Sequence, residues 1–166
     1  MSPRFFRALH AACLALIAAA PTVTAQIAGT WRVDNARSTG VGPNVGLTLV
    51  ISESADTFFV ERRFRLPQGP VVLQDTMVAN GAVLPYTFRA ASGLEGRGIR
   101  TIKRSGGRLE LADSVLIDTQ GGPAPRWTTQ TWSLNVAGDT LTQAIILRQP
   151  FSETPLTNVL VREKKS

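Results

Sequence analysis

Three charged side chains interrupt alternating rows of apolar residues in the sequence. Arg62, Asp75 and Asp113 each occupy a row of every second residue whose other members are hydrophobic. Rows with this period share one face of a β-strand, so these charges face inward if their apolar neighbours do. A buried charge must be paired or hydrogen-bonded, and the turn at 67–70 places Arg62 and Asp75 on consecutive strands where they can pair.

The Arg62–Asp75 pair has two interpretations. In the first, the planar fork of the Arg62 guanidinium holds the carboxylate of a fatty-acid-like ligand inside the fold. In the second, the two residues form a structural ion pair. An assignment of the faces that is wrong by one residue would turn every side chain to the other side, because the period is two.

Aromatic residues extend the set of candidate ligand-binding residues. Trp127 and Trp132 are five residues apart, which places them on opposite faces of one strand, and the residues between them are polar. A half-polar strand with an inward aromatic residue is typical of a small-molecule cavity. The predicted ligand-binding residues are therefore Arg62, Asp75, Tyr86, Trp127 and Trp132. The alternative is that one tryptophan belongs to the core and the other lies on the surface.

A basic cluster lies on one predicted hairpin. Arg97, Arg100, Lys103, Arg104 and Arg108 follow one another with no acidic residue among them. Such a cluster can bind an anionic envelope surface. The alternative is a solvated outer face that favours solubility and protects a strand edge from pairing. The sequence has no nucleic-acid recognition motif and few aromatic residues for stacking, so we expect no nucleic acid as a partner.

The N-terminus decides which catalytic residues are available. Two arginines precede an apolar run, and small residues lead up to Ala25, so residues 1–25 have the pattern of a Sec-type signal peptide. The only histidine, His10, and the only cysteine, Cys13, lie within this segment. Cleavage after Ala25 would leave a protein without either residue, and its formal net charge would fall by two from +6. That composition excludes a disulfide, a thiol nucleophile, a Ser-His-Asp triad and a zinc site built on His or Cys.

Enzyme chemistry would have to depend on the remaining carboxylates. Asp75 and Asp113 share the inward pattern and could act as acid and base if burial separates their pKa values. The sequence contains no calcium-loop pattern, no glycine-rich phosphate loop and no Gly-x-Ser-x-Gly motif. We therefore expect no metal and no cofactor, and a barrel enzyme is the weakest hypothesis.

The elements that position these residues are predicted to be β-strands throughout. Alternation with period two is interrupted by turn residues about every 8 to 12 positions, and no segment keeps a helical period. The pattern predicts about ten strands, at 27–33, 45–53, 58–66, 71–78, 83–90, 97–104, 108–117, 126–135, 140–148 and 157–164. Short turns favour an antiparallel up-and-down order, and closure into one barrel of about eight to ten strands would remove the exposed edges.

Short motifs resemble a known group of barrels. Gly29-Thr30-Trp31 resembles the Gly-x-Trp signature of lipocalins and related calycin barrels, whose tryptophan packs at the closed end under an arginine from near the last strand. Segments at 36–38, 81–86 and 133–142 are similar to those of small, secreted, uncharacterised bacterial lipocalin-like proteins. The resemblance implies an all-β, lipocalin-like barrel at 26–166, a structural role for Trp31 with Arg162 across its ring, and no catalytic residue.

These observations predict an exported, non-catalytic barrel, periplasmic or extracellular, that binds a small apolar or amphipathic molecule. The ligand's apolar part would be buried in the barrel, and one or two polar side chains would fix its orientation. The alternative function is an envelope-associated module that recognises anionic surfaces through the basic hairpin. We expect no transmembrane segment after position 25, because the remaining chain has no apolar run of about 20 residues.

Overall fold

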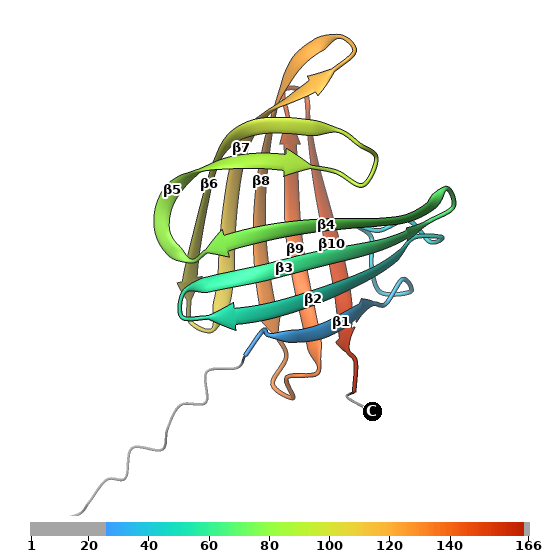
Figure 1. The fold of residues 1–166 in the computed structure, drawn as a ribbon, viewed down its shortest axis with the longest axis vertical. Coiled ribbons are helices and arrows are strands. Elements are labelled where there is room, and N and C mark those ends of the chain that lie inside the picture. Colours follow the sequence, from blue (N-terminus) through green and yellow to red (C-terminus); the bar gives the residue numbers. More distant parts are fainter. Residues whose placement is uncertain (1–25, 165–166) are drawn as a thin grey trace, which may run out of the picture.

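The computed structural model describes residues 26–164, and the regular elements in this range are all β-strands. The predicted signal peptide, residues 1–25, lies outside the described residues. Ten strands follow one another along the chain (Figure 1): β1 (Gly29–Val33), β2 (Gly46–Ser54), β3 (Thr57–Leu66), β4 (Gly69–Val78), β5 (Asn80–Arg89), β6 (Glu95–Ser105), β7 (Arg108–Thr119), β8 (Gly122–Leu134), β9 (Thr140–Gln149) and β10 (Ser152–Arg162). The predicted all-β antiparallel barrel is confirmed.

The ten strands form one antiparallel sheet that curls into a nearly closed barrel. Its order is β4-β3-β2-β1-β10-β9-β8-β7-β6-β5, so the first and last strands pair with each other. The prediction that closure removes every edge is wrong at one place, because β4 and β5 are the two ends of this order and do not pair. They are consecutive in the chain and are separated only by Ala79, but they diverge from there. Next to this point the register of β5 with β6 shifts between Asn80 and Val83.

β8 and β10 begin four and five residues before the starts that the sequence pattern predicts. The added segments include Pro123 and Pro125 in β8 and Pro155 in β10. Each of these segments pairs on one side only, since β9 meets β8 only from Trp127 onward and β1 meets β10 only near its end. Proline is tolerated there because an edge strand does not need every backbone N–H for pairing.

The hydrophobic core fills the end of the barrel near β1. Trp31 is fully buried, and its indole Nε1 donates to the carbonyl of Ile27 at 2.9 Å. Around it pack further buried apolar residues, among them Leu49, Phe58, Met77, Leu109, Leu141 and Leu160. A large aromatic side chain of this kind contributes much buried area, so this end of the barrel is solid.

Arg162 on β10 lies across the ring of Trp31, with its guanidinium carbon 4.1 Å from the ring centroid. The two residues are direct partners in the β1–β10 register. Arg162 also donates to the carbonyls of Gln26, Ala28 and Gly138 at 2.8–3.0 Å. A side chain on Gly29 would meet this guanidinium, because a Cβ there would lie 2.5 Å from its Nη1. Arg162 therefore joins the first strand, the last strand and the β8–β9 turn.

Candidate functional site

A cavity of about 340 Å³ lies inside the barrel; it borders the core through Leu49 and Trp132, but Trp31 does not line it. One part of its wall is apolar, with Leu49, Phe64 and Leu73 from β2–β4. The part from β8–β10 is polar and includes Gln143 and Asn158. This volume lies within the range of small-molecule sites, and an apolar wall with a few polar groups is their usual composition.

A cluster of charged side chains stands at this cavity. Arg100 on β6 donates from Nε to Asp113 Oδ1 at 2.6 Å and from Nη2 to Asp113 Oδ2 at 3.1 Å. These two residues are direct cross-strand partners, which explains the two-pronged contact. Arg100 Nη1 also donates to Asp75 Oδ2 on β4 at 2.5 Å, and Arg62 Nη1 lies 3.5 Å from the same oxygen. Period-two alternation thus placed Arg62, Asp75 and Asp113 on the inward face, where the structure has them.

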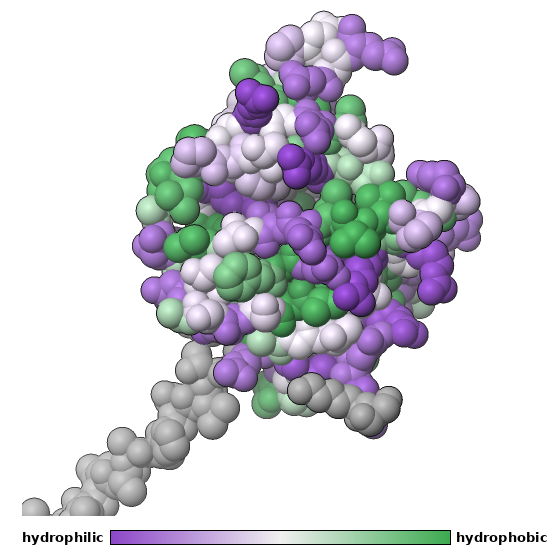
Figure 2. Space-filling model, viewed as in Figure 1, coloured by the Kyte–Doolittle hydropathy of each residue, from purple (hydrophilic) through white to green (hydrophobic). Residues whose placement is uncertain are grey.

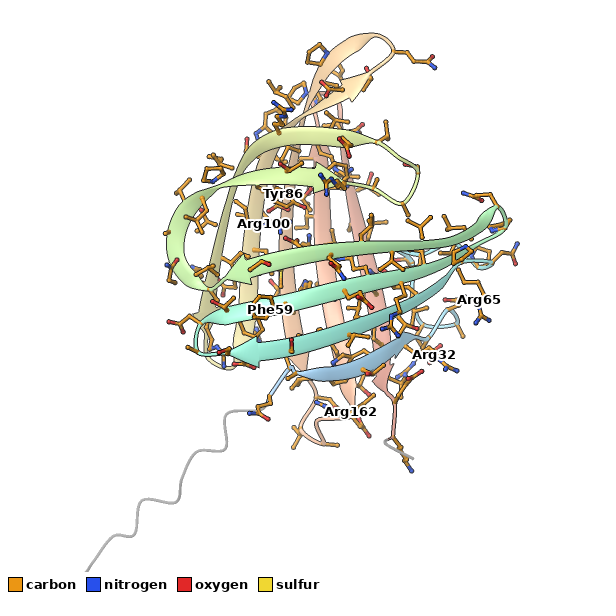
Figure 3. The ribbon with its side chains drawn as sticks, viewed as in Figure 1. Arg32, Phe59, Arg65, Tyr86, Arg100 and Arg162 are labelled. Atoms are coloured by element: carbon orange, nitrogen blue, oxygen red, sulfur yellow. The ribbon has the colours of Figure 1, made fainter. Side chains whose placement is uncertain are left out.

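Tyr86 on β5 covers the Arg100 guanidinium, whose carbon lies 3.3 Å from the centre of the Tyr86 ring (Figure 3). Burial raises the pKa of the Tyr86 phenol; the positive charge of Arg100 opposes this shift, and Asp75 and Asp113 add to it. Burial alone would lower the pKa of Arg100, but the hydrogen bond and charge of Asp113, with Asp75, outweigh it and the pKa is raised. Arg100 therefore stays charged and Tyr86 stays a neutral phenol near neutral pH.

Arg126 on β8 is a cavity residue that the sequence interpretation missed. Its guanidinium carbon lies 4.6 Å from the ring centroid of Phe88, and burial lowers its pKa. Within residues 26–164 it makes no ion pair, and its buried Nε has no hydrogen-bond partner. The signal was present in the sequence, because Arg126 lies six residues before the buried Trp132 and so shares its face.

The charges at the cavity do not balance. Arg62, Arg100 and Arg126 contribute three guanidinium groups, whereas Asp75 and Asp113 contribute two carboxylates. A fourth arginine that lines the cavity, Arg89, is matched by Glu95. One positive charge is therefore left over at a partly buried position, and an unpaired charge is costly there. A negatively charged group bound in the cavity would remove that cost.

Polar side chains of β8–β10 pair with one another at the inner wall. The Trp132 indole donates to Gln130 Oε1 at 3.1 Å, and Asn158 Nδ2 donates to Gln143 Oε1 at 3.2 Å. These contacts satisfy part of the hydrogen-bonding capacity of the amides, while Asn158 Oδ1 is buried without a partner. Trp132, Tyr86 and Arg62 line the cavity as the sequence interpretation placed them.

Trp127 does not belong to this site. It lies on the outer face of β8 with 42% of its surface exposed, whereas Trp132 is 1% exposed. The five-residue spacing separates the two side chains as expected, and the structure decides which of them is inside. The assignment of Trp127 to the ligand-binding set is corrected, because its side chain faces solvent.

The basic hairpin is not one continuous patch. Arg100 is turned inward and is 6% exposed, so it is removed from the predicted anionic-surface set. Lys103 pairs with Glu110 at 3.0 Å, and Arg104 pairs with Glu53 on β2. Within the described part of the chain only Arg97 and Arg108 of the set make no ion pair. Alternation along β6 and pairing with neighbouring strands thus disperse the charge that looks concentrated in the sequence.

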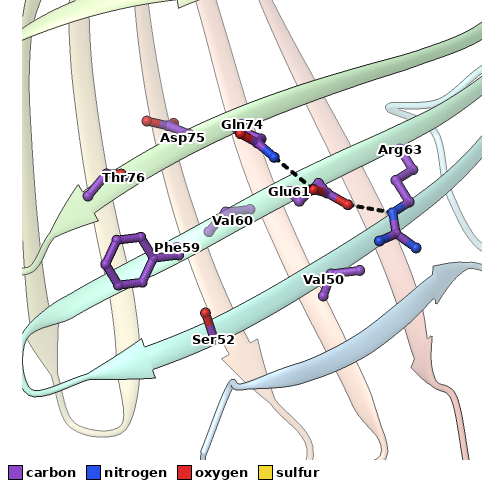
Figure 4. A pocket seen from close by; sticks show the side chains of 9 residues that line it. All are labelled: Val50, Ser52, Phe59, Val60, Glu61, Arg63, Gln74, Asp75 and Thr76. Carbon is purple, nitrogen blue, oxygen red and sulfur yellow. Dashed lines mark hydrogen bonds and ion pairs between the residues drawn. The ribbon is translucent and has the colours of Figure 1, made fainter.

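A second hollow lies on the outside of β2–β4, with a volume of about 430 Å³ (Figure 4). Glu61 accepts from Arg63 at 2.5 Å and from Gln74 at 2.9 Å, and these hydrogen bonds lower its pKa. Figure 2 shows polar and apolar side chains intermixed over these strands. The polar groups here satisfy one another, so the outer hollow lacks the unmatched charge of the interior cavity. Asp75 borders this hollow as well.

Among residues 26–164, no group of three or more His, Cys, Asp or Glu side chains is placed to hold a metal ion. The same residues contain no helix that is long and apolar enough to cross a membrane. The two inward carboxylates, Asp75 and Asp113, both bind the Arg100 guanidinium. Neither carboxylate is therefore free to exchange a proton with a substrate, as acid–base catalysis requires.

A nearly closed, ten-stranded antiparallel barrel of this kind is a calycin-type fold, and solved structures with similar folds support the assignment. A REP1-NXSQ fatty acid transporter is 12% identical, with a TM-score of 0.55, over 84% of this chain and 97% of that protein. The zebrafish ileal bile acid-binding protein, complexed with cholic acid, is 14% identical, with a TM-score of 0.54, over 82% and 98%. Secretory abundant heat soluble protein 4 from Ramazzottius varieornatus is 12% identical, with a TM-score of 0.54, over 82% and 94%. No protein-family model and no curated protein matches the sequence.

Proposed function

We propose that this barrel binds a small amphipathic molecule with an acidic head group in its interior cavity and does no chemistry on it. The observation that carries the proposal is the unmatched positive charge at the cavity, with Arg126 as the arginine that lacks a carboxylate. Apolar residues on the opposite wall suit an alkyl or ring system. Two proteins of similar fold are named for ligands of this chemical class: one is a fatty acid transporter and the other is a bile acid-binding protein.

Arg62 is the second anchor in this proposal. Its contact with Asp75 is long, at 3.5 Å, and Asp75 is held more closely by Arg100. The Arg62 guanidinium is therefore free to form a two-pronged contact with a ligand carboxylate, which Arg does better than Lys. Arg100 is less available for this role, because Asp113 already occupies its fork.

The test compares an acid with the alcohol of the same length. Dodecanoate and dodecan-1-ol share an alkyl chain, so a difference in their dissociation constants reports on the head group. Arg126→Gln should weaken binding of dodecanoate about tenfold or more and leave dodecan-1-ol nearly unchanged, because a hydrogen bond to a charged group contributes roughly 1.5–3 kcal/mol. Isothermal calorimetry or displacement of a fluorescent probe measures both constants.

Arg97→Gln is the matched control, since Arg97 is an exposed arginine on the outside of β6 without an ion pair in the described residues. It should bind both ligands as the unchanged protein does. If dodecanoate fails to bind to any variant, or binds no differently after Arg126→Gln, the acidic head group is not what this cavity recognises.

We also propose that the protein acts outside the cytoplasm, as the signal-peptide pattern at 1–25 predicts. The support is in the sequence alone. The intact mass of protein recovered from its host would test this, with an N-terminus at Gln26 as the expected result and an uncleaved N-terminus as the contrary one.

A further inference from the structure

The seam between β4 and β5 is the one interruption in the sheet of the described barrel. These strands are the two ends of the strand order and share no backbone ladder. In Figure 1 they diverge from their short connection at Ala79, and β5 runs above β4 with a space between the ribbons. Side chains, not backbone hydrogen bonds, must therefore hold this part of the wall together.

Among the described residues, two ion pairs join strands from opposite sides of the seam: Arg104 on β6 pairs with Glu53 on β2, and Arg100 on β6 pairs with Asp75 on the edge strand β4 itself. Asp75 belongs to β4, and Arg100 belongs to β6, which is the strand behind β5 in the sheet order. Their contact at 2.5 Å joins the two ends of the sheet, and both side chains are largely buried, at 15% and 7% exposed. Arg100 is held from its own side of the seam by Asp113 and by the ring of Tyr86. Asp75 is thus the movable partner.

The Asp75–Arg100 pair lies at the edge of the interior cavity. Arg100, Tyr86 and Arg62 line the cavity, and Asp75 reaches Arg100 from β4. Figure 3 shows Arg100 and Tyr86 at the level of the gap between the β4 and β5 ribbons. Separating Asp75 from Arg100 would open the cavity to solvent between β4 and β5, where no backbone ladder blocks the way.

We propose that the β4–β5 seam is the entrance to the cavity and that the Asp75–Arg100 ion pair closes it. This inference rests on the proposed function. An entering acid replaces the Asp75 carboxylate on Arg100 by its own, so the guanidinium is never left unpaired. An alcohol of the same length has no charge to offer, so it enters only when the buried pair breaks without replacement, and such a break is costly.

An acid should therefore associate with the barrel faster than an alcohol of the same length. Stopped-flow measurement with the unchanged protein should show dodecanoate associating faster than dodecan-1-ol, by about tenfold if one charged hydrogen bond is lost in the slower case. This comparison needs no variant and remains available if a variant fails to fold. Equal association rates for the two ligands would overturn the proposal.

Asp75→Asn tests the pair directly, because it keeps the shape of the side chain and removes its charge. Association of dodecan-1-ol should become about tenfold faster, while that of dodecanoate changes little. General attraction of the positively charged protein for an acid would persist in this variant and weaken in salt. A difference between acid and alcohol that survives Asp75→Asn therefore contradicts the entrance and points to that attraction.

Glu61→Gln is the matched control. Glu61 lies on neighbouring β3, borders the same outer hollow and pairs with Arg63, but it does not cross the seam. Its variant should show unchanged rates for both ligands, and a rate increase equal to that of Asp75→Asn would also overturn the proposal. If dodecanoate binds but Asp75→Asn leaves the association rate of dodecan-1-ol unchanged, the entrance is elsewhere and the binding function stands. If dodecanoate does not bind, the binding function itself is wrong.

Discussion

At the scale of single residues, the important feature is that one guanidinium organises the charged part of the cavity. Arg100 holds Asp113 with two hydrogen bonds, holds Asp75 with a third, and lies under the ring of Tyr86. A buried ion cluster of this kind contributes little net stability but is strongly destabilising if one partner is removed, because the other charge is left unpaired. The individual side chains therefore fix the geometry of the site more than they stabilise the fold.

The titration of Tyr86 gives a prediction at this scale. Tyr86 is the only tyrosine in the chain, so the ultraviolet signal of ionised tyrosine reports on it alone. Its pKa in the folded protein is raised above the ordinary value of 10.0, mainly by burial. The folded titration midpoint should exceed that of the unfolded chain, which should lie near 10.

The sign of the stability change follows from the same shift. Between the two midpoints the folded protein keeps a proton that the unfolded chain has lost. The contribution of Tyr86 to stability is therefore complete below the unfolded pKa and falls as the pH rises through the folded one. A titration in denaturant provides the reference, and identical midpoints in both states would show that Tyr86 is not buried against Arg100.

At the scale of strands, β8 shows how one element serves both sides of the barrel. Its inward residues include Arg126, Thr128, Gln130 and Trp132, and its outward residues include Trp127. Because successive side chains alternate, charge or aromatic content counted along the strand says little about what one face presents. The same reason divides the basic residues of β6 between the cavity and the surface.

Trp127 provides the prediction for this scale. The chain has three tryptophans, of which Trp31 and Trp132 are buried and Trp127 is 42% exposed. Trp127→Phe should remove most of the fluorescence that iodide quenches and leave the free energy of unfolding nearly unchanged. Trp132→Phe is the control and should keep the quenchable fraction. Quenching that persists after Trp127→Phe would place a different tryptophan at the surface.

At the scale of the whole molecule, the barrel has a solid end and a hollow part. Pairing of β1 with β10 closes the sheet between the beginning and the end of the described chain, and Trp31 under Arg162 fills the adjoining end. The cavity borders this core through Leu49 and Trp132, whereas the β4–β5 seam lies at the two ends of the strand order, far from the β1–β10 pairing in its middle. Such a division lets the cavity carry an unmatched charge while the apolar end supplies the stability.

Trp31→Ala tests this division. The substitution should lower the free energy of unfolding by about 3–5 kcal/mol, as for other large aromatic truncations in a core. The same substitution at Trp127, which is exposed, should cost much less, and the comparison controls for the chemistry of the change. Urea unfolding measures both values. Equal losses at the two positions would mean that Trp31 does not fill the closed end.

The sequence by itself determined the strands, their antiparallel order and the inward set of Arg62, Asp75 and Asp113. The physical reason is local, because period two and turn residues act over a few positions. It also predicted Trp31 and Arg162 as partners, through a motif. It could not predict that β8 begins before Pro123 and Pro125, or that β10 begins before Pro155. Whether a strand tolerates proline depends on which neighbouring strand it lacks.

Only the tertiary structure decided the composition of the site. Arg100 looked like a surface charge because it stands among four other basic residues, and Arg126 looked like the start of a strand. Their burial depends on which residues lie opposite them on β7 and β5, and such contacts join positions far apart in the chain. The open seam has the same origin, because pairing of β4 with β5 depends on the curvature of the entire sheet and not on the one residue that joins them.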